Sequence, residues 1–159
     1  MDIDYRKSER TPPPIGAVKF LITKAGQGVS QTGKDFFSLT CTDLRTGATF
    51  EDRVFTTHRS AWKLEALIES LGLTIPDGGG FKITCDDLEG RIGFGEIEHR
   101  KLNSGRTVGE FKSFWSRTYA IEKDPSLAEI PDPSDAVLDS YTLPLSRKAK
   151  TMTASEVEA

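Results

Sequence analysis

The residues with the clearest potential for binding chemistry are aromatic and cationic side chains near the ends of β-like runs. Single-stranded nucleic acids are bound by flat rings, on which bases stack, and by cations, which neutralise phosphates. Phe36 follows Lys34 at the start of one such run, and Arg53 and Phe55 alternate at the end of the next, although Phe55 could belong to either face because Val54 competes for the core. Further cations and aromatics surround a later turn. The candidate nucleic-acid-binding residues are Lys34, Phe36, Arg53, Phe55, Arg100, Lys101, Arg106, Lys112 and Trp115.

Short strands must position these residues. Alternation of apolar and polar side chains predicts strands over residues 18–23, 36–42, 49–55 and 108–115, and an interrupted strand over 81–99, in which residues 81–85 alternate strictly. Residues 24–34 are expected to form a pliable connection and residues 100–106 a hairpin turn. In the second run, alternation directs Phe37, Leu39 and Cys41 inward and Phe36, Ser38, Thr40 and Thr42 outward.

One segment has a helical pattern. Residues 59–72 carry apolar side chains at helical spacing, and Gly72 is suited to end the helix in a left-handed conformation. Thr57 or Ser60 could cap its start. We expect Trp62 to anchor the helix in the core and not to stack on bases. The predicted apolar face consists of Trp62, Leu64, Leu67, Ile68 and Leu71.

The predicted order of elements is three strands, one helix and then further strands. A five-stranded OB barrel has this order, with the helix between strands three and four. We therefore expect a mainly β, OB-like barrel over residues 15–119. The proline run at residues 12–14 favours a mobile, extended arm over residues 1–14. Residues 120–159 are acidic and contain several prolines, so we expect a flexible C-terminal tail.

Composition fits one domain with tails, and we expect a cytoplasmic location. The chain has 159 residues, of which 36% are hydrophobic. No stretch approaches the roughly 18 consecutive apolar residues that cross a bilayer, and the N-terminal residues lack the apolar core of a signal peptide. The net charge is −3, but residues 15–117 carry +1 and residues 118–159 carry −4. The acidity therefore lies in the tail, and the central part is nearly neutral.

The sequence gives little support for catalysis or for a bound metal. Cys41 and Cys85 lie in alternating apolar runs, where small core residues are expected, and His58 and His99 have no zinc-ligand spacing. The carboxylates at residues 86–89 fit a turn as well as a Mg²⁺-dependent nuclease site, because Asp is favoured in turns. The glycines at 78–80 lack the Lys-Ser/Thr of a phosphate-binding loop. We expect no metal, no cofactor and no enzymatic activity.

A group of segments carries a family resemblance. These segments are Gly16-Ala-Val-Lys-Phe-Leu-Ile-Thr-Lys24, Thr32-Gly-Lys34, Trp62-Lys-Leu64, Leu71-Gly-Leu73 and Leu88-Glu-Gly-Arg91. Together they resemble a family of small bacteriophage proteins, catalogued as a domain of unknown function and often encoded among replication and recombination genes. The resemblance covers residues 15–115. It implies an OB-like fold and suggests binding of single-stranded DNA. If the chain is phage-encoded, the expected cytoplasmic location is that of the host cell.

The acidic tail is similar to the tails through which single-stranded DNA-binding proteins recruit replication or recombination partners. It departs from them at Ser155-Glu-Val-Glu-Ala159, which lacks the terminal aromatic residue that often follows their acidic run. The sequence thus predicts a non-catalytic, sequence-tolerant single-stranded DNA-binding protein of phage replication or recombination. The alternative, favoured by the neutral central charge, is a protein-interaction or inhibitor module on the same barrel with no nucleic-acid ligand.

Overall fold

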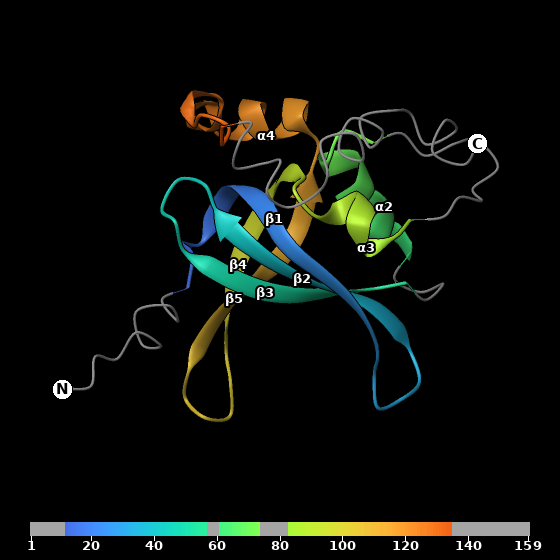
Figure 1. The fold of residues 1–159 in the computed structure, drawn as a ribbon. Helices are drawn as coiled ribbons and strands as arrows, with labels where there is room; N and C mark the ends of the chain where they lie inside the picture. The colour runs from blue at the N-terminus through green and yellow to red at the C-terminus, as the bar shows by residue number, and fades with distance from the viewer. Residues whose placement is uncertain (1–11, 57–60, 74–82, 135–159) are drawn as a thin grey trace.

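The computed structural model describes residues 12–56, 61–73 and 83–134. Within these residues, five strands form one antiparallel sheet in the order β3-β2-β1-β4-β5 (Figure 1). None of the helices in these ranges is long and apolar enough to cross a membrane. The strands are β1 (Gly16–Val29), β2 (Asp35–Asp43), β3 (Thr49–Phe55), β4 (Ile92–Lys101) and β5 (Thr107–Trp115). The helices are α2 (Ala61–Ser70), α3 (Cys85–Leu88), α4 (Arg117–Lys123) and the 3-10 helix η2 (Pro125–Glu129).

The predicted mainly β class and its five strands are confirmed, but the helices differ from the prediction. The sequence indicates one helix, whereas α3, α4 and η2 accompany α2 in the described residues. Helices α2 and α3 pack against the inner face of the sheet, and α4 and η2 pack against its outer face. The pattern of a short helix is weak in a sequence, because few turns of apolar periodicity are available.

The centre of the sheet is β1, which pairs with β4 over residues 16–21 and with β2 over residues 20–29. The sequence predicts that this strand ends at residue 23 and that a connection follows. Instead the strand continues to Val29, and residues 30–34 alone form the turn. Main-chain pairing with β2 outweighs the low strand propensity of Gly26 and Gly28.

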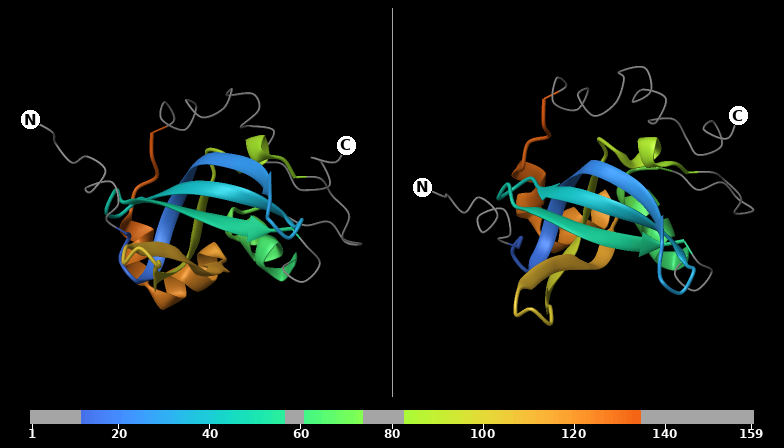
Figure 2. Two further views of the ribbon diagram at one scale, coloured as in Figure 1. Left: turned by 90° about the horizontal axis from the view of Figure 1, so that it is seen from below. Right: turned by 60° about the horizontal axis from the view of Figure 1, so that its bottom comes forward.

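Two bulges bend the sheet. The register between β1 and β2 skips Thr23, so Ile22 and Ala25 both face the core although three positions separate them. The register between β4 and β5 skips Lys112 in the same way. An extra residue bends its strand and increases the local twist. The sheet consequently curls around the core, as the arched path of β1 in Figure 2 shows.

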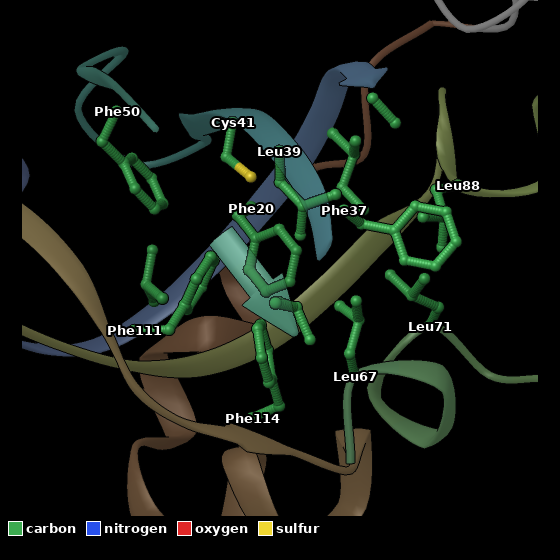
Figure 3. Close-up of a cluster of buried hydrophobic side chains, with 14 of the residues drawn as sticks. Phe20, Phe37, Leu39, Cys41, Phe50, Leu67, Leu71, Leu88, Phe111 and Phe114 are labelled. Atoms are coloured by element: carbon green, nitrogen blue, oxygen red, sulfur yellow. The ribbon is translucent and has the colours of Figure 1, made fainter. Parts of the chain in front are cut away.

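The core is built from the inward faces of all five strands and of α2 and α3. The rings of Phe20 and Phe111 have centroids 4.7 Å apart, and those of Phe111 and Phe114 are 4.4 Å apart. Alternation in β2 places its apolar side chains here, as predicted. The labelled core residues in Figure 3 are Phe20, Phe37, Leu39, Cys41, Phe50, Leu67, Leu71, Leu88, Phe111 and Phe114.

A carboxylate joins the two edge strands, β3 and β5. The backbone N–H of Phe111 in β5 donates to Oδ2 of Asp52 in β3 at 2.9 Å, and the N–H of Arg53 donates to Oδ1 at 2.8 Å. Strand pairing among the described residues joins β3 to β2 and β5 to β4. The boundary between the edge strands β3 and β5, which we call the β3–β5 seam, is therefore bridged by the side chain of Asp52.

The prediction for Trp62 is wrong. Its side chain is 63% exposed, whereas Leu67, Ile68 and Leu71 are buried. Trp62 lies nine residues before Leu71, which is about two and a half helical turns, so the two side chains project from opposite sides. Gly72 ends the helix with a φ of 78°, as expected. The expected caps Thr57 and Ser60 lie outside the described residues.

The predicted strand over residues 81–85 is also wrong where the structure describes it. Residues 83 and 84 are in no strand, and Cys85 begins α3. The N–H of Thr84 donates to Oδ2 of Asp87 at 2.8 Å. This local capping interaction starts a helical turn and outweighs the alternation of apolar residues. Residues 81 and 82 lie outside the described part of the chain.

Both expected tails contact the sheet where they are described. Leu127, expected in a flexible tail, is buried on the outer face beside Phe94 and Ala120. Lys19 of β1 is buried there too, and its Nζ donates to the carbonyl of Ile130 at 2.7 Å. At the other end, the carbonyl of Pro13 accepts a hydrogen bond from Nε2 of His99 at 2.6 Å. The apolar residues of the tail fold onto the sheet because it offers an apolar surface that they lack alone.

Replacement of Asp52 by Ala is expected to destabilise the protein by about 1–3 kcal/mol, because two backbone N–H groups lose their acceptor. Urea unfolding measures the change. Glu51→Ala removes the exposed neighbouring carboxylate and is the matched control, expected to change stability by less than about 0.5 kcal/mol. An equal loss in the two variants would contradict the role of Asp52 in joining β3 and β5.

The stability difference between the wild type and Asp52→Asn is expected to depend on pH. Burial raises the pKa of the Asp52 carboxyl above its ordinary value of 3.8, against the lowering effect of the Phe111 N–H. The folded protein therefore holds this proton more tightly than the unfolded chain does. Relative to the variant, the wild type should lose stability as the pH rises from about 4 through the folded-state pKa. Unfolding at several pH values tests this, and a relative gain with rising pH would refute it.

Candidate nucleic-acid interface

A groove crosses the outward face of β2 and β3 and continues to the β4–β5 hairpin. Gln27 and Gly28 of the β1–β2 hairpin line it, as do residues of the β4–β5 hairpin. Both hairpins extend from the same side of the sheet, at the bottom of Figure 1. The full lining consists of Pro12, Gln27, Gly28, Phe36, Ser38, Thr40, Thr49, Phe50, Glu51, Asp52, Arg53, Phe55, Arg100, Leu102, Arg106, Val108, Gly109 and Glu110.

Strand alternation brings the side chains of the groove onto one face. In β3, Val54 is buried in the core, which leaves Arg53 and Phe55 on the outward face. Phe36 of β2 is directly opposite Phe55 in the register. Their rings meet edge to face, with centroids 5.5 Å apart. The two phenylalanines and the arginine thus form one cluster.

Phe36 faces the groove, as the sequence predicts, but its ring is largely covered. The guanidinium carbon of Arg53 lies 4.5 Å from the ring centroid. The side chain of Phe36 is therefore only 9% exposed. The surface that this cluster presents to the groove belongs mainly to Arg53, which is exposed.

The formal charges along the groove are balanced. The cations are Arg53, Arg100 and Arg106, and the acids are Glu51, Asp52 and Glu110. Nε of Arg100 pairs with Oε2 of Glu110 at 3.0 Å. Among the described residues, no ion pair involves Arg53 or Arg106. These two arginines are the cations best placed to meet an incoming anion.

The structure brings together five of the nine predicted residues. Phe36, Arg53, Phe55, Arg100 and Arg106 all line the groove. They come from β2, β3, β4 and the turn between β4 and β5. The sequence predicts these elements from the alternation of apolar residues and from turn-forming residues.

The other four predicted residues lie outside the groove lining. Lys34 is exposed in the β1–β2 turn, and Lys101 is exposed on the β4–β5 hairpin. Lys112 is at the bulge, where its Nζ lies 3.8 Å from Oε2 of Glu96. Trp115 packs against Tyr119 of α4, with ring centroids 5.2 Å apart. Trp115 therefore belongs to the packing between α4 and the outer face of the sheet.

Sequence reasoning did not single out Gly28, Ser38 or Thr40 as parts of the site. Ser38 and Thr40 are at the outward positions of β2 that alternation identifies, so that signal was available. Gly28 had no such signal, because its place beside Phe36 depends on the pairing of β1 with β2.

The two cysteine thiols are poorly suited to nucleophilic chemistry. Burial raises the pKa of the Cys41 thiol well above its ordinary value. Burial, together with the nearby charges of Glu89 and Asp86, also raises the pKa of the Cys85 thiol. Both cysteines are unbonded, and a thiol with a raised pKa is a poor nucleophile. In the part of the chain that the structure describes, no group of three or more His, Cys, Asp or Glu residues could hold a metal ion.

Neither protein-family models nor curated proteins match this chain. Its function must therefore be inferred from the groove and from the architecture that forms it.

Proposed function

We propose that the protein binds single-stranded DNA in the groove, without catalysis and with little sequence preference. The observation that carries this proposal is the cluster of Phe36, Arg53 and Phe55, flanked by Arg100 and Arg106, along one open groove. Flat groups for bases next to cations for phosphates are what such binding requires.

The architecture supports the proposal. A central strand that pairs with both β2 and β4, and a helix between β3 and β4, fit an OB-like barrel. We propose that the barrel is completed at the β3–β5 seam through Asp52. In OB folds, the face of strands 2 and 3 and the loops that follow strands 1 and 4 bind oligonucleotides. The groove occupies the corresponding face and lies between the corresponding hairpins.

We place the function in replication or recombination, on the strength of the resemblance to phage proteins from such genes. Affinity would then come from stacking and phosphate neutralisation, so it would fall steeply with salt. The acidic C-terminal residues would serve to recruit partner proteins, as in single-stranded DNA-binding proteins with similar tails.

A protein-interaction module is the second candidate. The balance of three arginines and three acids along the groove favours it, because DNA binding usually uses an excess of cations. Such a module would bind a protein partner through the same face and would not respond to oligonucleotides.

Replacement of both Arg100 and Arg106 by Ala is expected to weaken binding of a fluorescent oligo-dT. The dependence of log affinity on log salt should flatten by about 0.7 for each phosphate that the variant no longer neutralises. Fluorescence anisotropy at several salt concentrations measures both effects. The double variant Lys101→Ala and Lys112→Ala is the matched control, because it also removes two cations. Each double variant breaks one ion pair: the test variant frees Glu110, and the control frees Glu96. The control should bind as the wild type does.

Two results would contradict the proposal. If the wild type fails to bind oligo-dT even at low salt, the protein-interaction module becomes the better explanation. If both double variants lose affinity equally, the DNA does not lie in the groove.

A further inference from the structure

The ring of Phe36 lies over β1 at a position where that strand has no side chain. Gly28 in β1 is directly opposite Phe36 in the register. A Cβ atom at Gly28 would lie 2.6 Å from Cζ and 2.9 Å from Cε1 of the Phe36 ring. Both distances are shorter than van der Waals contact, so the ring occupies the space that a side chain at position 28 would take.

The guanidinium of Arg53 covers the ring from the groove side. Its central carbon lies 4.5 Å from the ring centroid, and the edge-on ring of Phe55 supports Phe36 laterally. Arg53 is paired with Ser38 in the register of β2 and β3, which fixes its position in the strand. The guanidinium thus lies over the Phe36 ring, and the exposed Arg53 side chain lines the groove.

We propose that Arg53, and not Phe36, is the residue on which a base stacks, with Phe36 and Gly28 acting as positioning residues. This inference rests on the proposed binding of single-stranded DNA. A guanidinium is planar and stacks on both an aromatic ring and a nucleobase, and its charge also attracts the neighbouring phosphate. A lysine ammonium keeps the charge but has no plane. The contribution of Arg53 should therefore depend on the presence of bases.

Arg53→Lys tests this with two probes, a fluorescent oligo-dT and an abasic oligodeoxynucleotide of equal length. The variant is expected to bind oligo-dT at least about five-fold more weakly than the wild type, which corresponds to the lower end of base-stacking energies. It should bind the abasic probe as the wild type does. Arg117→Lys is the matched control, because Arg117 also lies over a phenylalanine, 5.9 Å from the ring centroid of Phe94, but outside the groove lining. This control should leave both affinities unchanged.

Gly28→Ala and Phe36→Leu test the positioning role. The added methyl group displaces the Phe36 ring, and leucine removes its flat surface, so both variants should lose affinity for oligo-dT and keep affinity for the abasic probe. Thermal melts identify variants that have lost their fold, and a merely structural defect would weaken binding of both probes.

The possible outcomes separate this inference from the proposed function. If the wild type binds oligo-dT and Arg53→Lys binds it equally well, the stacking role of Arg53 is refuted and the proposed function stands. If Arg53→Lys weakens binding of both probes equally, the guanidinium acts through contacts that do not need a base, such as hydrogen bonds to phosphate, and the stacking role is again refuted. If the wild type binds neither probe, the proposed function fails and this inference fails with it.

Discussion

The whole molecule depends on one long strand that pairs on both sides. The first residues of β1 pair with β4 and its later residues pair with β2, so each half of the sheet is attached to the other through this strand. The bulge at Thr23 bends β1 between these two partners. Because of this shared strand, two hairpins that are far apart in the sequence extend from the same side of the sheet, with the outward face of β2 and β3 between them (Figure 1).

The side-chain bridge between the two edge strands and the groove involve the same short segment of β3. Asp52 accepts the N–H of Phe111 across the seam, and the next residue, Arg53, turns to the opposite face and lies on Phe36. The bridge to β5 and the cation that lies on Phe36 therefore come from neighbouring residues of one strand. Strand geometry explains this arrangement, since successive side chains point to opposite faces.

Alternation is enough to predict the faces of β2, including the outward position of Phe36, because a period of two is fixed by strand geometry. In β3 it leaves the face of Phe55 open, because Val54 competes with Phe55 for the core, and the structure shows that Val54 is the buried one. Contacts that depend on register, such as the one between Gly28 and Phe36, could not be predicted, because the register follows from where the 30–34 turn falls. The exposed position of Trp62 follows from helical geometry, since nine residues separate it from the buried Leu71.

The salt bridge beneath η2 has a consequence for where the folding unit ends. Lys19 is nearly inaccessible to solvent, and its Nζ lies 2.6 Å from Oδ1 of Asp132, seventeen positions beyond the last strand residue. A buried ammonium without a counterion is unfavourable. The folding unit consequently extends at least to Asp132, because a shortened form that ends directly after β5 would lose both the counterion of Lys19 and the segment that covers the outer face of the sheet.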